Sequence, residues 1–344
     1  MERARARERR RLGLSYADAP PRRPVARRIE RIRIAAPRRL SLDTPDYKAT
    51  MGFLAKVRAC VLDQDRRVCL DLRQCQRISP EMAPFLAAEF ARLRYLKGAE
   101  AITGLSPEDE HARWTLHAMG FFEVLGLLDP RSLEEGDDTE VIYRIVSGTA
   151  LDGAITKELT DAMGEAMGLP EEAMEPVQKA LNEALENISE HAYFDTDRLY
   201  FPAEANRWWI CGVTLADTKS AYVLACDLGM TIPATIPETA KRRGPLNVAA
   251  LANFLKDGGG TQEEKLLAAA FEEGVTRRPD GKGGRGLGKM AQLMGGFEKA
   301  SLTVWSGEAA ATMSKASPKV QTERLPLCFP GTYILWHLQQ GTTE

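Results

Sequence analysis

Long apolar runs and paired cysteines are missing from this 344-residue sequence, and we expect no secretory leader. No apolar run approaches the roughly 18 to 20 residues that a membrane-spanning helix needs, and no apolar segment follows the arginine-rich start as it would in a secretory signal. The six cysteines form no C-x-x-C pair, so neither zinc nor disulfides are indicated. Cys69, Cys211 and Cys226 lie in apolar runs and are expected to be buried thiols. We therefore expect a cytoplasmic protein.

A strong net charge is also absent, but the charge of -2 is unevenly distributed. Arginines crowd the first 28 residues, at Arg3, Arg5, Arg7, Arg9, Arg10, Arg11, Arg22, Arg23, Arg27 and Arg28. Because residues 1–27 contain few apolar side chains, we expect a flexible tail there. The positive charge of this tail could attract nucleic acid or another polyanion. The alternative is a solvated tail without a partner, or a wrongly assigned start codon.

The remaining sequence, with 44% hydrophobic residues overall, is long enough to bury a sizeable core and to form two domains. In the first, residues 28–130, alternating isoleucines at 29, 32 and 34 and the apolar run 67–72 predict strands. Helical spacing predicts helices over 81–96 and 108–119, with a short strand over 99–104 between them. The order of strand, helix, strand and helix predicts a small α/β layer.

A polar segment without periodicity, residues 131–139, is the predicted linker to a second domain, residues 140–344. This domain begins with predicted helices over 154–167 and 171–193. Predicted strands follow over 207–215, 221–227, 300–305 and 332–337. The long connection 229–288, with one predicted helix near 263–273, is either a functional lid or a disordered insertion.

Three polar residues are spaced four apart in the second of these helices: Glu183, Asn187 and His191. This spacing places a carboxylate, an amide oxygen and an imidazole on one helix face. Asn187 offers the hard oxygen that Mg²⁺ accepts beside phosphates, and Glu183 could polarise a water or a hydroxyl. The other register, Asn182, Glu186 and Glu190, is interpreted as solvent-facing. A plain amphipathic surface helix is the alternative interpretation.

Two glycine-containing motifs complete the pattern. Asp227 ends an apolar strand, where a carboxylate could accept the exocyclic amine of adenine, and Gly229 permits a positive φ and a close backbone approach. Gly284, Gly286 and Gly288, with Leu287 between the last two, precede a predicted helix over 289–294, so free N–H groups could cradle phosphates. Arg285 and Lys289 could add positive charge. The alternative is a plain flexible glycine loop.

In order and spacing these motifs resemble the GHKL ATPases, the ATP-binding domains of gyrase, heat-shock chaperone, histidine kinases and mismatch-repair proteins. By that resemblance, Glu183-x-x-x-Asn187-x-x-x-His191 is the N box, Asp227-Leu-Gly229 the first glycine box and Gly284-Arg-Gly-Leu-Gly288 the second. Pro330-Gly331-Thr332 resembles the closing Gly-Thr element. The family usually has a second glycine where this chain has Thr231. The resemblance implies a Bergerat-type two-layer α/β sandwich with a mixed sheet, binding ATP and Mg²⁺.

The first domain resembles STAS domains, the fold of bacterial anti-sigma-factor antagonists. The resemblance is carried by the strand 68–72, the turn Ile78-Ser-Pro-Glu81, the helix after it and Gly120-Phe-Phe122. In that family a serine of the turn is phosphorylated by a GHKL kinase. Here Pro80 and Glu81 occupy the serine positions and Ser79 comes one place early. A docking module for a protein partner is the simpler interpretation, and Glu81 could mimic a permanent negative charge.

Two functional hypotheses follow. The first is a bacterial signalling enzyme, a Mg-dependent ATPase or a serine/threonine kinase of anti-sigma-factor type, with Glu183 as base, Asn187 on the metal and Asp227 on adenine. The second is a catalytically silent, nucleotide-gated interaction switch, with nucleic-acid contact through Arg3–Arg28 as a further alternative. A homodimer stays open. A histidine-kinase role is not favoured, because His111 and His117 fall in the first domain and His337 in a predicted strand.

Overall fold

The computed structural model of the chain describes residues 30–125, 140–193, 206–256, 259–272, 286–292 and 295–341. Residues 32–344 belong to one compact unit. The predicted tail, 1–27, and the predicted linker, 131–139, lie outside the described residues. None of the described helices is long and apolar enough to cross a membrane.

The first part of the chain forms the predicted α/β layer. Strands β1, β3 and β5 pair in parallel in the order β1-β3-β5, and β2 pairs in parallel with β4. The predicted strands and helices of this region are confirmed to within a few residues. Its elements are β1 (Ile32–Ala35), β2 (Arg39–Leu40), α2 (Thr44–Arg58), the π-helical η2 (Ala59–Asp63), β3 (Val68–Asp71), β4 (Arg77–Ile78), α3 (Met82–Lys97), the 3₁₀ turn η3 (Ala99–Ala101), β5 (Ile102–Leu105), α4 (Glu110–Ala118) and α5 (Phe121–Val124).

Helix α2 is absent from the sequence-based expectations. Its signals are Pro45 in the first turn and buried apolar side chains at Tyr47, Met51 and Leu54, spaced four and three residues apart. Helix α3 was predicted, but it is buried on nearly all sides rather than on one stripe. Such a helix must have packing partners on two sides.

The second part contains a five-stranded sheet with the order β6-β7-β8-β10-β9. Every neighbouring pair is antiparallel, so the expectation of a mixed sheet was wrong. Strands β9 and β10 run well beyond their predicted ends. The elements are β6 (Glu140–Gly148), α6 (Gly153–Ala166), α7 (Glu171–Asn187), the π-helical η4 (Ile188–Ala192), β7 (Trp208–Leu215), β8 (Ser220–Asp227), α8 (Ile232–Arg243), α9 (Pro245–Lys256), α10 (Gln262–Ala269), α12 (Gly286–Gln292), β9 (Lys299–Ser314) and β10 (Gln321–Gln339).

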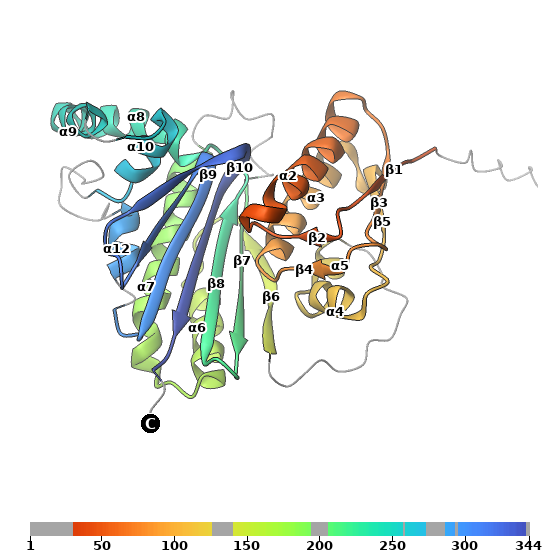
Figure 1. Cartoon of the computed structure of the whole chain (residues 1–344), viewed down its shortest axis with the longest axis horizontal. Helices are drawn as coiled ribbons and strands as arrows, with labels where there is room; N and C mark the ends of the chain where they lie inside the picture. Colours follow the sequence, from red (N-terminus) through yellow and green to blue (C-terminus); the bar gives the residue numbers. More distant parts are fainter. Residues whose placement is uncertain are drawn as a thin grey trace, which may run out of the picture. The chain divides into compact units, whose positions relative to one another are not determined.

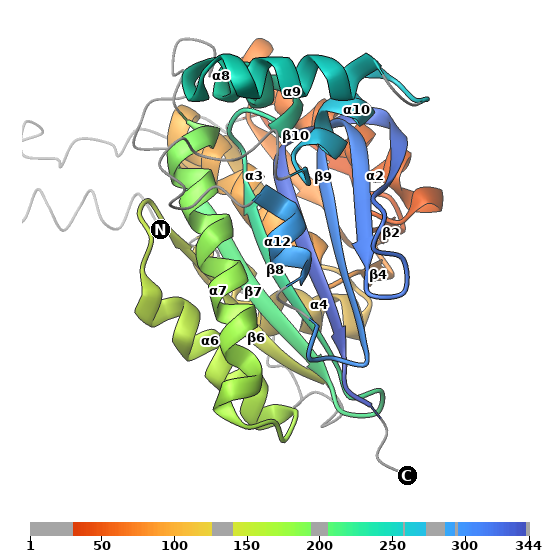
Figure 2. The same ribbon diagram turned by 90° about the vertical axis from the view of Figure 1, so that its left-hand side faces the viewer.

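Both faces of this sheet are covered. Helices α6, α7 and α12 lie over one face, and the elements of the first part lie behind the other (Figure 1, Figure 2). One hydrophobic core joins α3 to that second face, where Phe85 stacks on Phe329 with ring centroids 4.5 Å apart and Trp209 and Tyr333 are buried. The helices of the second part thus lie over one face, as expected for a two-layer sandwich, and the first part of the chain adds a third layer on the other face.

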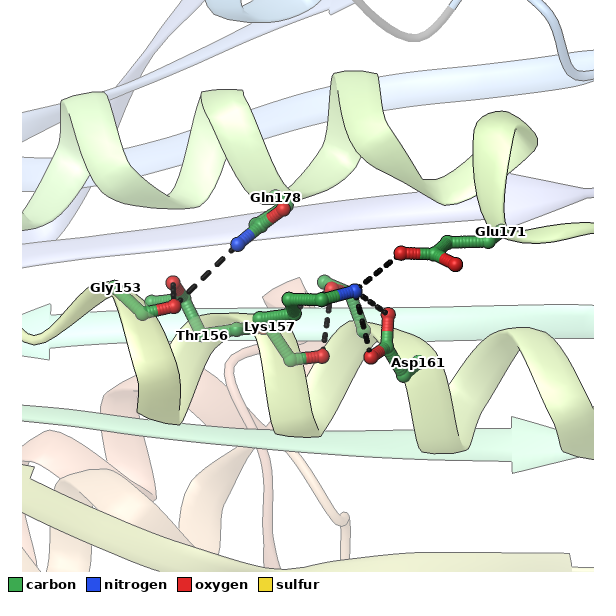
Figure 3. A network of polar contacts seen from close by, with 7 residues as sticks. Gly153, Thr156, Lys157, Asp161, Glu171 and Gln178 are labelled. Carbon is green, nitrogen blue, oxygen red and sulfur yellow. Dashed lines mark hydrogen bonds and ion pairs between the residues drawn. The ribbon is translucent and has the colours of Figure 1, made fainter.

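A polar network fixes the start of α7 against α6 (Figure 3). Lys157 on α6 bonds to Asp161 at 2.9 Å and also to Glu171, the first residue of α7. The side chain of Gln178 donates to the carbonyl of Gly153 at 3.4 Å. These groups are exposed, so their main effect is to set the register of the two helices rather than to stabilise them strongly.

The connection predicted as a lid or insertion holds three helices among its described residues, α8, α9 and α10. Only α10 overlaps a predicted helix, and it ends four residues before the predicted end. Thr261 and Glu264 form a capping box at its start. The helices lie at one end of the sheet (Figure 2).

Candidate functional site

A pocket opens between α7, η4, α8, the end of β8 and the middle of β10. The empty space within it is about 690 Å³, a volume that includes the open solvent at its mouth. Most of its lining is apolar, as is usual for small-molecule sites. The lining residues are Ala184, Asn187, Ile188, His191, Ala192, Asp227, Met230, Ile232, Thr235, Ile236, Thr239, Arg243, Ala270, Leu287, Thr332 and Ile334.

Asp227, the last residue of β8, is the buried carboxylate of this pocket, with 1% of its surface exposed. Its Oδ1 accepts the N–H of Gly229 at 2.8 Å. Burial raises the pKa of Asp227 to about 7, although hydrogen bonds from the N–H groups of Gly229 and Thr332 oppose the rise. A strongly perturbed carboxyl in a concave apolar site is a candidate for ligand recognition.

The predicted helix face is only partly assembled at the pocket. Asn187 and His191 line it, whereas Glu183 does not, although Glu183 lies one turn before Asn187. After Asn187 the helix widens into the π-helical turn η4, which still brings His191 to the pocket wall. His191 Nε2 lies 3.7 Å from a carboxylate oxygen of Glu190.

The other register of α7 is solvent-facing only in part. Glu186 and Glu190 are exposed, as expected. Asn182 is not: it is half-buried, and its Oδ1 accepts the Thr156 hydroxyl of α6 at 2.6 Å.

Gly229 is required by close packing and not by a positive φ, which it does not adopt. A Cβ at this position would lie 2.3 Å from the carbonyl oxygen of Ala192. The same carbonyl accepts the N–H of Met230 at 2.7 Å, so η4 and the loop after β8 are locked together. The positive φ in this region belongs to Gly331, at 93°, where a Cβ would lie 2.2 Å from the carbonyl oxygen of Asp227.

The second glycine motif is only partly described. Gly284 and Arg285 lie outside the described residues, and α12 begins at Gly286, three residues earlier than predicted. Leu287 lines the pocket, but its N–H donates to the Ala270 carbonyl at 3.1 Å and is not a free donor. A Cβ at Gly288 would lie 2.4 Å from the carbonyl oxygen of Phe271, which explains this glycine by packing. Lys289 does not line the pocket.

Thr332 completes the pocket opposite Asp227, its partner across the β8–β10 ladder. Its hydroxyl lies 3.1 Å from the Ser306 hydroxyl, which donates to the Gly331 carbonyl at 2.9 Å. Ser306 Oγ in turn accepts the N–H of Ile232, at the start of α8. This chain of bonds attaches α8 to the sheet edge.

Sequence reasoning missed the polar wall that α8 contributes. Thr235, Thr239 and Arg243 all line the pocket. They are spaced four residues apart, the same signal that identified the α7 face. The two helices therefore present polar side chains to the same cavity.

The turn that resembles the STAS phosphorylation site is covered in this chain. Ser79 is 5% exposed, and its hydroxyl donates to the Leu40 carbonyl at 3.2 Å. Tyr333 of β10 donates to the carbonyl of Glu81. Burial raises the pKa of the Glu81 carboxyl. The turn packs against the second part's sheet rather than offering a serine to solvent.

The arrangement offers one buried carboxylate in an apolar cavity, flanked by an amide, an imidazole, three hydroxyls and a guanidinium. It suits a flat, amine-bearing apolar group with a polar extension. Among the described residues no three or more His, Cys, Asp or Glu side chains gather as a metal site. Comparison with protein-family models, with curated proteins and with solved structures finds no match.

Proposed function

We propose that the chain binds ATP at this pocket as a regulatory protein of the GHKL kind. The observation that supports it best is the buried Asp227 carboxylate at the end of β8, surrounded by apolar side chains. In such a site an adenine ring would be desolvated and its exocyclic amine would pair with the carboxylate. The pairing discriminates well, because a ligand without the amine leaves a buried carboxylate unpaired.

The phosphates would extend toward the polar wall. Asn187 lines the pocket. It would give an amide oxygen to a Mg²⁺ that is otherwise held by phosphates and water, the usual way in which Mg²⁺ binds beside nucleotides. His191 and Arg243 could contact phosphate oxygens. The residues present therefore fit both groups, with Mg²⁺ supplying charge neutralisation at the phosphates.

Calorimetric titration with ATP and ADP in the presence of magnesium tests this function. We expect micromolar binding by the wild type and a loss of about thirtyfold or more in Asp227→Asn, which presents a donor to a donor. Asp217→Asn is the matched control, because Asp217 is exposed in the turn between β7 and β8. Folded wild-type protein that binds neither nucleotide would contradict the proposal, as would an Asp227→Asn variant that binds normally.

The position of Glu183 favours a second function, the nucleotide-gated switch. The proposed base is half-buried on α7 and does not line the pocket, whereas Asn187 and His191 do. A general base must reach the proton that it removes, directly or through one water. Binding without chemistry needs no such residue. The nucleotide would then act by its different affinity for two arrangements of the segment between β8 and β9.

Turnover of Glu183→Gln distinguishes the two functions. An ATPase or a serine/threonine kinase should lose turnover while its ATP affinity stays within about tenfold. Glu186→Gln, one turn away and exposed, is the control for the helix. A wild type that binds ATP but neither hydrolyses it nor labels a protein partner would support the switch. Turnover that survives in Glu183→Gln would exclude Glu183 as base.

The proposal of a protein partner follows from the resemblance alone, and that of a nucleic-acid partner from the charge of the tail. We propose a protein partner for the first, STAS-like part of the chain. Its exposed side is the place to look, because its α3 face is buried on the sheet. Nucleic-acid contact through Arg3–Arg28 lies outside the described residues, and its test is a tail-dependent, salt-sensitive binding curve.

A further inference from the structure

A buried cluster of charges joins α3 to the loop that carries Asp227. Glu89 is 0% exposed and Arg92 5% exposed. Glu89 bonds to Arg58 at 2.7 Å through one carboxylate oxygen and to Arg92 through the other. Arg92 also donates from Nη1 to the backbone carbonyl of Leu228, at 3.3 Å. An arginine fork can hold two acceptors at once in a fixed geometry.

The Leu228–Gly229 peptide group is held at both ends. Its carbonyl accepts from Arg92, and its N–H, which belongs to Gly229, donates to Asp227 Oδ1 at 2.8 Å. The preceding N–H, of Leu228, donates to the Tyr193 hydroxyl at 3.2 Å. Rotation of the peptide away from Arg92 would therefore also turn the N–H away from the carboxylate that faces the pocket.

We propose that Arg92 is a positioning residue for the pocket: by holding the Leu228 carbonyl, it fixes the peptide whose N–H orients Asp227. The first part of the chain then completes a site whose lining residues all come from the second part. A hydrogen bond from a guanidinium also polarises the peptide and strengthens the bond on its far side. Any effect on nucleotide affinity rests on the proposed function, whereas the effect on the loop does not.

The test compares Arg92→Lys with Arg58→Lys. Both substitutions keep a positive charge beside Glu89. A lysine at position 92 lacks the fork and cannot hold Glu89 and Leu228 together. Arg58 makes no bond to Leu228, so its substitution disturbs the same cluster without touching the loop. A double variant, Glu89→Met with Arg92→Met, removes the buried charges, as replacement by apolar residues is often tolerated. It covers the case in which Arg92→Lys does not fold.

Two readouts separate positioning from general stability. The first is the amide ¹⁵N resonance and hydrogen-exchange rate of Gly229, because the resonance of an amide follows the hydrogen bond to the carbonyl before it. The second is the Kd for ATP. We expect Arg92→Lys and the double variant to shift the resonance, speed the exchange and weaken ATP binding by about fivefold. Arg58→Lys should leave both readouts as in the wild type.

Each result decides the inference. An unchanged Gly229 resonance in both Arg92 variants would overturn it, even if wild-type protein binds ATP normally. Equal changes in Arg92→Lys and Arg58→Lys would also overturn it, because the cluster would then act only through stability. If the wild type binds no nucleotide, the proposed function fails, and a Gly229 shift confined to the Arg92 variants still establishes the positioning of the loop.

Discussion

The hydroxyl of Tyr333 donates a hydrogen bond to the backbone carbonyl of Glu81, 252 residues earlier in the chain. Tyr333 follows Thr332 on β10, and successive residues of a strand point to opposite faces. Thr332 therefore lines the pocket while Tyr333 reaches the turn before α3. One strand contacts both the candidate site and the first part of the chain.

Substitution of Tyr333 by phenylalanine should destabilise the protein by about 1–2 kcal/mol. The ring is 0% exposed and keeps its edge contacts with Trp305 and Phe329, so no cavity forms. The loss comes from the partly buried Glu81 carbonyl, which is left without this donor. Urea unfolding measures it. Tyr143→Phe is the control, because that half-buried hydroxyl donates to Ala162 within the second part. Equal losses in the two variants would show that the Glu81 contact has no special weight.

Stability should fall as pH rises through the range set by Asp227. The folded pKa, about 7, lies above the ordinary value of 3.8, so between these values the folded state holds a proton that the unfolded state has released. The corresponding loss is on the order of 4 kcal/mol from pH 4 to pH 8. Asp227→Asn should remove this slope in urea titrations. Other groups, such as His337 with its lowered pKa, contribute to both proteins and cancel in the difference. Parallel curves would contradict a buried, protonated Asp227.

Adenosine binding should weaken as pH falls below about 7. The exocyclic amine needs the ionised carboxylate as acceptor, so affinity should drop about tenfold for each pH unit below the pKa of Asp227. Adenosine is the better probe than ATP because it has no phosphate that titrates or attracts His191 and Arg243. Calorimetry between pH 5.5 and 8.5 gives the profile. An affinity that is independent of pH would argue against carboxylate recognition of the base.

The sequence predicted pocket residues where the pattern of a single helix or strand was sufficient. The periodicity of α7, the apolar run of β8 and the polar residue at its end predicted Asn187, His191 and Asp227, which the pocket brings together. Glu183 shares their spacing but does not line the pocket, because helix spacing does not fix how far along the helix a pocket extends. The sequence of α3 predicts a helix but does not show which elements pack against it. The covering of the sheet's second face could therefore not be predicted.

The same difficulty applies to the antiparallel sheet and to the glycines. Strand direction depends on connections whose path is set by tertiary packing, and the segment between β8 and β9 contained two helices, α8 and α9, that were not predicted. Gly229 and Gly288 were interpreted as ligand-binding glycines. The backbone of Ala192 lies close to Gly229, and that of Phe271 lies close to Gly288. Each neighbour is distant in sequence, so the close packing leaves no local signal around the glycine.

Alanine substitutions test whether close packing requires glycine at these positions. A Cβ at Gly229 or Gly288 would lie 2.3 or 2.4 Å from a backbone carbonyl oxygen, so backbone must move, and we expect each variant to lose more than about 1 kcal/mol of stability. Gly52→Ala is the control: it lies inside α2 with nothing within 4 Å of a new Cβ, and it should gain about 0.5–1 kcal/mol. Thermal unfolding of the three variants measures the contrast. If Gly229→Ala and Gly288→Ala are as stable as wild type but bind ATP poorly, the glycines serve the ligand directly, and the packing explanation fails.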